Sequence, residues 1–120
     1  RTTELFQFEV KDPYLMGTTI NCYPFPFRKD GVRAFFQPFL NKSKYISQFK
    51  LPFRSFLSWK NLTKSLFDYV VKNGGVFHLW GHCWEIDKNN MWEELENVLS
   101  YISGKERVHY LTNSETIESL

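Results

Sequence analysis

Apolar and polar side chains alternate over residues 6–11, and this period of two is typical of a half-buried strand. Residues 76–80 are apolar on both faces, as expected of a strand buried in a parallel sheet. A short apolar run at residues 108–111 predicts a third strand. The pattern therefore predicts three strands that are widely separated along the chain.

A helical period of apolar residues lies between the first two strands. Ser58 is a candidate N-cap for this helix, and Asn73-Gly74 is a candidate C-terminal stop. The apolar stripe consists of Trp59, Leu62, Leu66, Tyr69 and Val70.

A second helical stripe lies between residues 90 and 104. We expect Asn90 to cap this helix in a pair with Glu93, and Gly104 to end it. Its buried stripe would be Met91, Leu95, Val98, Leu99 and Ile102. A capping box of Thr112 and Glu115 predicts a last helix that runs to Leu120.

Residues 14–57 show no clean period and contain four prolines, so we expect a long loop here. Eight of the twelve phenylalanines lie in this segment. A loop so rich in phenylalanine must pack on the body of the protein, line a groove or contact a partner.

Strands that alternate with helices predict an α/β fold with a parallel sheet, in one domain over residues 1–120. About three strands are too few for a closed barrel, which usually takes about 250 residues. An open sheet of this size leaves its edges exposed. Either the sheet gains strands from a partner, such as a second copy, or these residues are part of a larger barrel whose other half is missing. Exposed edges also predict oligomers, in some cases with exchanged elements.

Composition excludes several classes of protein. Hydrophobic residues make up 42% of the chain and charged residues 23%, which argues against disorder. The net charge of +2, with no basic stripe interleaved with exposed aromatic residues, gives no reason to expect nucleic-acid binding. No apolar run approaches the roughly 20 residues that a membrane helix needs. Localisation is not indicated.

His82 follows the predicted strand 76–80 by two residues. Catalytic groups of α/β proteins gather at the carboxyl ends of strands, where a histidine can act as a general acid or base. The alternative is a loop histidine that is bonded to a neighbouring carbonyl. Position alone does not choose between the two.

The neighbours of His82 allow further alternatives. Trp80 and Trp84 could form an apolar wall for a sugar ring, or they could belong to the core. His78 is expected to be a hydrogen-bonded core or rim histidine, although a zinc site of His78, His82 and Cys83 is conceivable. No cysteine-hydrolase motif surrounds Cys83, so we expect a small buried side chain rather than a nucleophile.

Three runs, VFHLWGHCWEID, NMWEELENVLSYIS and VHYLTNSETIE, together resemble the C-terminal part of the polysaccharide deacetylase family, which shares the chitooligosaccharide deacetylase homology domain. The resemblance covers residues 74–118 well. It covers residues 1–20 weakly, through RTT and GTTINCYPF. Where the family carries serine next to the histidine, this chain has Cys83.

The resemblance implies a deformed (β/α) barrel that hydrolyses N-acetyl groups of acetylated oligo- or polysaccharides. In that family an aspartate and two histidines hold a divalent metal, usually zinc. A metal-bound water attacks the acetyl group, and a histidine gives a proton to the leaving amine. By resemblance, His82 is this acid, Arg1 orients the catalytic base, and Trp80 lines the acetyl pocket.

The family motif that supplies the metal ligands and the base is absent from these 120 residues. We therefore expect no bound cofactor and no deacetylase activity from this chain alone. One alternative is a non-catalytic carbohydrate-binding or protein-interaction domain on a remnant of the scaffold. Another is a separate metal or cysteine hydrolase that uses His82 and Cys83.

Overall fold

The computed structural model describes residues 5–28 and 35–120. Its elements follow the order β1 (Ile20–Asn21), α1 (Gln37–Gln48), a 3-10 helix η1 (Phe53–Phe56), α2 (Trp59–Asn73), β2 (Leu79–Trp80), α3 (Cys83–Lys88), α4 (Trp92–Ile102) and α5 (Asn113–Glu118). Within the described ranges the chain forms a small α/β domain whose sheet has two strands.

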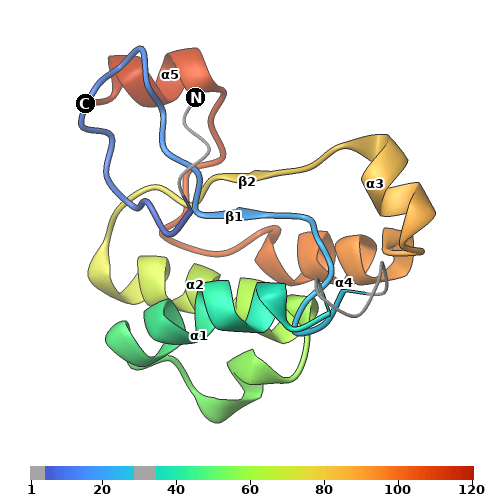
Figure 1. The fold of residues 1–120 in the computed structure, drawn as a ribbon. Helices are drawn as coiled ribbons and strands as arrows, with labels where there is room; N and C mark the ends of the chain where they lie inside the picture. The colour runs from blue at the N-terminus through green and yellow to red at the C-terminus, as the bar shows by residue number, and fades with distance from the viewer. Residues whose placement is uncertain (1–4, 29–34) are drawn as a thin grey trace.

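The two strands are parallel, with Ile20 opposite Leu79 and Asn21 opposite Trp80. Helices α1, α2 and α4 lie together on one side of this sheet, as Figure 1 shows. Helix α3 lies beyond the carboxyl end of β2, and α5 lies on the opposite side of the molecule (Figure 1). The carboxyl ends of both strands therefore point toward α3.

Helix α2 forms as the sequence predicts. The Ser58 side chain accepts a hydrogen bond from the Asn61 backbone N–H at 3.1 Å, and Gly74, with φ of 83°, follows the last turn. This φ lies in the left-handed region, where glycine has no steric penalty. The buried stripe faces the core as predicted, although Tyr69 is only half-buried.

The prediction for residues 14–57 is wrong, because this segment contains β1, α1 and η1. Pro38 lies in the first turn of α1, where its missing N–H costs no helical hydrogen bond. The buried face of α1 includes Lys42, a charged residue that hides the apolar period. In the sequence, Pro38 and the other prolines favoured a loop.

Two of the three predicted strands are not observed as strands. Residues 6–11 are extended only in part: the Phe6 N–H donates to the Thr19 carbonyl, and Phe6 has a φ of 59°. Residues 108–111 form no ladder, and Arg107 just before them has a φ of 66°. The alternation over residues 6–11 indicates which side chains are exposed, but it does not indicate whether the segment has a strand to pair with.

The C-terminal helices differ from the predictions in detail. The short helix α3 follows β2 closely, where the apolar pattern predicts no helix. Met91, not Asn90, is the N-cap residue of α4, and no side chain caps it. In the stripe of α4, Leu99 is exposed rather than buried. The capping box of Thr112 and Glu115 is confirmed.

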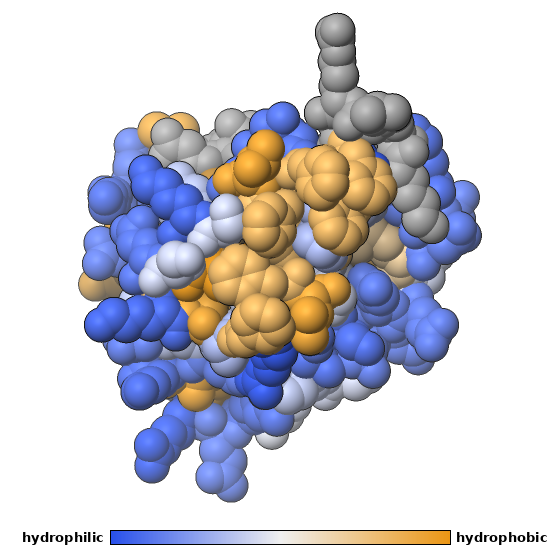
Figure 2. Space-filling model, turned by 60° about the horizontal axis from the view of Figure 1, so that its bottom comes forward, coloured by the Kyte–Doolittle hydropathy of each residue, from blue (hydrophilic) through white to orange (hydrophobic). Residues whose placement is uncertain are grey.

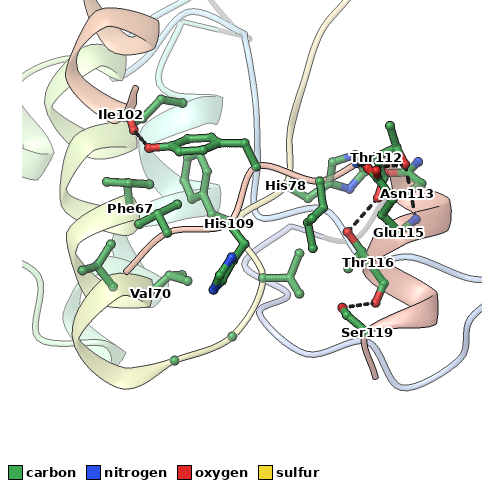
Figure 3. A pocket seen from close by; sticks show the side chains of 18 of the residues that line it. Phe67, Val70, His78, Ile102, His109, Thr112, Asn113, Glu115, Thr116 and Ser119 are labelled. Carbon is green, nitrogen blue, oxygen red and sulfur yellow. Dashed lines mark hydrogen bonds between the residues drawn. The ribbon is translucent and has the colours of Figure 1, made fainter. Parts of the chain in front are cut away.

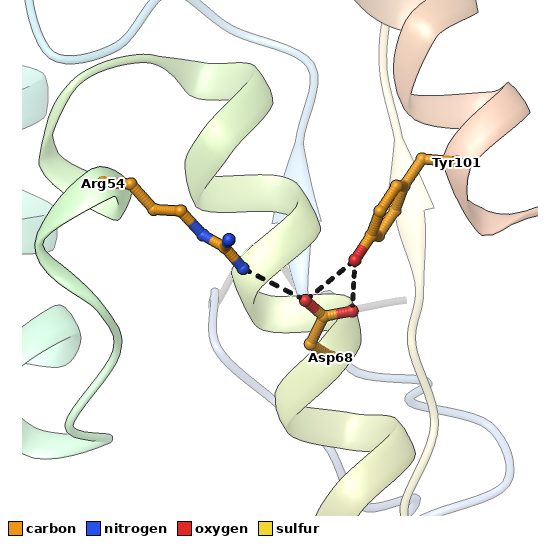
Figure 4. A network of polar contacts seen from close by, with 3 residues as sticks. All are labelled: Arg54, Asp68 and Tyr101. Atoms are coloured by element: carbon orange, nitrogen blue, oxygen red, sulfur yellow. Dashed lines mark hydrogen bonds and ion pairs between the residues drawn. The ribbon is translucent and has the colours of Figure 1, made fainter.

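A polar network joins three helices around Asp68 of α2 (Figure 4). Arg54 of η1 lies 3.3 Å from Asp68 Oδ2, and the Tyr101 hydroxyl of α4 donates to the same carboxylate at 2.8 Å. This hydrogen bond to Asp68, with burial as a smaller cause, raises the pKa of Tyr101. The network fixes how η1 and α4 sit against α2.

Candidate functional site at the carboxyl end of the sheet

The junction between β2 and α3 holds the residues that the sequence singled out. Trp80 ends β2, and His82 is the N-cap residue of α3 with extended backbone angles. Trp84 lies in the first turn of α3. Ile86, on the opposite side of this short helix, is buried in the core and holds α3 in place.

The imidazole of His82 lies between two indole rings. Its centroid is 5.0 Å from that of Trp80, with the rings nearly perpendicular. It is 5.7 Å from the centroid of Trp84, with the planes 20° apart, so these rings stack. His82 is exposed, and the two contacts restrict its orientation while leaving it accessible to solvent.

Trp84 is 65% exposed, whereas Trp80 is half-buried. An exposed aromatic face next to a histidine suits stacking against the apolar face of a sugar ring. Trp84 is therefore not a core residue, which leaves the alternative of an apolar wall for a sugar ring.

Gly81 sets the path of the chain at this junction. A Cβ on Gly81 would lie 2.9 Å from the Cβ of Cys22, so a side chain does not fit without movement. Just before it, the Trp80 carbonyl accepts a hydrogen bond of 2.7 Å from the Cys22 N–H. This close approach to the neighbouring strand places His82 directly at the sheet end.

Cys22 lies at the end of β1 and is buried. Burial raises the pKa of its thiol to about 12, with smaller contributions from the charges of Glu94 and Glu85. The thiol therefore stays protonated at neutral pH and is a poor nucleophile. The prediction that Cys83 is a small buried side chain is wrong, because Cys83 is exposed on the first turn of α3.

Sequence reasoning did not find Asn21, the last residue of β1. Its carbonyl accepts a 2.8 Å hydrogen bond from the Trp59 indole, while its side-chain Oδ1 is buried with no hydrogen-bond partner within residues 5–28 and 35–120. The β-branched run before it, Thr18 to Ile20, was the available signal for a short buried strand. This amide oxygen is a free acceptor near the carboxyl end of the sheet.

His78 is the hydrogen-bonded histidine that the sequence predicts. Its Nδ1 lies 2.7 Å from the Gly17 carbonyl oxygen, and its backbone N–H donates to the Thr19 hydroxyl. In the parts of the chain that the structure describes, no three His, Cys, Asp or Glu side chains are grouped so that they could hold a metal ion. The residues described here therefore do not fit a metal site of their own. Arg1 lies outside the described residues.

A hollow lies away from His82, at the opposite end of the sheet. It encloses about 700 Å³ between residues 74–78 and 107–112, and α5 closes one side of it. Figure 3 shows His109 and His78 among its lining, together with Phe67 and Val70 of α2. The hollow thus separates two runs that the sequence predicts to be strands of one sheet.

The chain was compared with protein-family models, with curated proteins and with solved structures, and none of the three comparisons gave a significant match. No helix among the described residues is long and apolar enough to cross a membrane.

Proposed function

We propose that this chain is the C-terminal part of a domain of the polysaccharide deacetylase type, a partial (β/α) barrel that removes N-acetyl groups from sugars. His82 supplies the proton to the leaving amine, and Trp80 and Trp84 form the wall against which the sugar lies. The observation that carries the proposal is the position of His82, which lies at the carboxyl end of a parallel strand between two indole rings.

The chemistry of the step explains why this position suits an acid. Breaking the bond between the acetyl carbon and nitrogen needs a proton on the departing amine. A proton donor is effective when its ring is held in one place next to the bond. The contacts of His82 with Trp80 and Trp84 provide that restriction, and its exposure leaves room for a substrate.

The metal ligands and the catalytic base of such an enzyme would come from a segment outside these 120 residues. When bound in the complete domain, the metal would supply an activated water. In the proposal, the present chain alone releases no acetate. It contributes the acid and, through Arg1, the group that orients the base.

The first test is a titration with N-acetylated chitooligosaccharide, observed through the four indole N–H signals of the ¹⁵N-labelled chain. The signals of Trp80 and Trp84 should move as sugar is added. The signal of Trp59, which is buried and donates to Asn21, should stay in place, and it is the internal control. A titration that leaves Trp80 and Trp84 unmoved at millimolar sugar would contradict the sugar site.

A second function, non-catalytic carbohydrate binding, is supported by the exposed indole of Trp84. It predicts the same indole shifts but no role for His82 in turnover. The two functions separate when the metal-binding half is supplied, because only the enzyme then releases acetate in a manner that depends on His82.

A further inference from the structure

An apolar patch covers the outer side of α1 and η1, remote from the sheet. It appears at the centre of Figure 2, which brings forward the lower part of the view in Figure 1. Its exposed members are Phe27, Phe35, Phe36, Leu40, Phe53 and Leu57, which we call the phenylalanine patch. Phe53 is the most exposed member of the patch, at 77%.

The patch is ordered by contacts among its own rings. Phe27 stacks on Phe35 with centroids 4.8 Å apart, and Phe36 meets both rings edge to face. Phe53 lies 6.1 Å from Phe56, which is half-buried beneath it. Exposed and contiguous apolar surface of this kind marks a site of interaction with a protein or a membrane.

The exposed charged side chains of α1 and η1 themselves are basic. Residues 35–64 contain six lysines and arginines and no acidic residue, whereas residues 85–118 contain eight acidic and three basic residues. On α1, Lys44 is exposed one turn after Leu40, and Lys50 is exposed just after this helix. Of the six basic residues of 35–64, Lys42 is buried and Arg54 is paired with Asp68. Lys44 and Lys50 are therefore the exposed cations that lie beside the patch with no acidic partner nearby in sequence.

Figure 2 shows no hollow at the centre of the patch. The 700 Å³ hollow and a smaller one of about 300 Å³ beside Phe8 and Asn73 contain none of its residues. Small ligands and helical peptides need a concave site. Protruding phenylalanine and leucine side chains with lysines beside them instead suit a flat partner surface. Such a partner has an apolar interior under an anionic outer layer.

We propose that the phenylalanine patch docks on the surface of an anionic lipid bilayer, with its apolar side chains in the acyl boundary and the lysines beside it at the headgroups. This surface uses none of the residues of the sugar site. The two proposals can therefore fail independently.

The test is flotation with vesicles of phosphatidylcholine alone and of phosphatidylcholine with about 30% phosphatidylserine, which carry the negative surface potential that basic segments recognise. The chain should float with the anionic vesicles only. Binding should weaken as salt is raised, because exposed charges are screened.

The apolar contribution is tested by the double change Phe53→Ser and Leu57→Ser, which removes two exposed side chains without touching the core. We expect the partition coefficient to fall about tenfold or more. The matched control is Tyr14→Ser with Leu15→Ser, since these side chains are 89% and 54% exposed in the loop before β1. The control should bind as the unmodified chain does, and circular dichroism verifies that both variants are folded.

The electrostatic contribution is tested by Lys44→Glu with Lys50→Glu, for which we expect a loss of more than about fivefold for each charge. Lys11→Glu with Lys72→Glu, exposed elsewhere, should have little effect. No flotation, or equal binding of the patch and control variants, would overturn the proposal. A dimer that forms through the patch would also overturn it. Sedimentation velocity would then show a dimer that the double change Phe53→Ser with Leu57→Ser dissociates.

Discussion

Lys42 shows at the scale of one residue how a charge can be buried at a cost. It lies on the inner face of α1, only 4% exposed, with its Nζ 5.7 Å from the centre of the Phe25 ring. Burial lowers the pKa of Lys42 from 10.5 to about 8. The charged form is therefore less stable in the folded protein than in the unfolded chain.

This shift has a definite sign for stability. Below pH 8 both states carry the proton, and the folded state bears the full cost of burying the charge. Between pH 8 and 10.5 the unfolded chain binds more protons at this site, so the contribution of Lys42 to stability rises with pH. The shift corresponds to about 3 kcal/mol.

We predict that Lys42→Met raises the free energy of unfolding at pH 7 by up to about 3 kcal/mol. The difference between the variant and the unmodified chain should shrink as pH rises from 8 toward 10.5. Urea denaturation at a series of pH values measures it, and groups common to both proteins cancel. A difference that is constant with pH would show that Lys42 does not titrate as its burial requires.

The two cysteines differ in burial, and we expect them to differ in reactivity. Cys22 is buried with its pKa raised to about 12, whereas Cys83 is exposed. We predict that a maleimide at pH 7 modifies one thiol per chain rapidly, and that Cys83→Ser abolishes this reaction until the chain unfolds. Mass spectrometry after digestion identifies the labelled residue, and rapid labelling of Cys22 would contradict the assignment.

At the scale of elements, helices were predicted where a capping residue at the start and a glycine at the end frame an uninterrupted apolar stripe. Ser58 and Gly74 frame α2, and Thr112 with Glu115 begins α5, as the sequence predicts. Helix α1 was missed because Lys42 interrupts its stripe. Local signals thus identify a helix when capping residues frame it and no charged residue interrupts its apolar stripe.

Strands were predicted less well, for a different physical reason. A strand needs a partner that is distant in sequence, and alternation does not name the partner. Residues 18–21 carried no clear period, yet β1 pairs there with β2 across nearly 60 residues. For the site, the position of His82 after a parallel strand could be predicted, but the contribution of Asn21 and Cys22 from β1 could not.

The N-cap of α2 gives a prediction at this scale. Ser58→Ala removes the acceptor for the Asn61 N–H and should lower the free energy of unfolding by about 1 kcal/mol. Ser100→Ala, at an exposed position within α4, is the matched control and should be close to neutral. Chemical denaturation of the two variants makes the comparison, and equal losses would mean that the cap contributes nothing specific.

At the scale of the whole molecule, three regions have separate characters. The carboxyl end of the two-stranded sheet holds His82 between Trp80 and Trp84. The opposite end holds the 700 Å³ hollow, and the outer side of α1 and η1 holds the phenylalanine patch. An open sheet of two strands leaves edges for further strands, which agrees with a domain that is completed by another segment or a second copy.

The central claim, that His82 is the acid of a deacetylase, is tested most directly by acetate release. The chain is joined to the metal-binding half of a polysaccharide deacetylase and given zinc with N-acetylated chitooligosaccharide. We predict acetate from the joined protein, none from the present chain alone, and a loss of about 10²–10⁴-fold in kcat for His82→Ala. Sugar binding, followed by the indole signals, should persist in that variant.

His109→Ala, a change of an exposed histidine beside the hollow, is the matched control and should retain activity. Zinc-dependent acetate release by the 120 residues alone would contradict the proposed division of roles. Full activity of the joined His82→Ala protein would contradict the role of His82 itself.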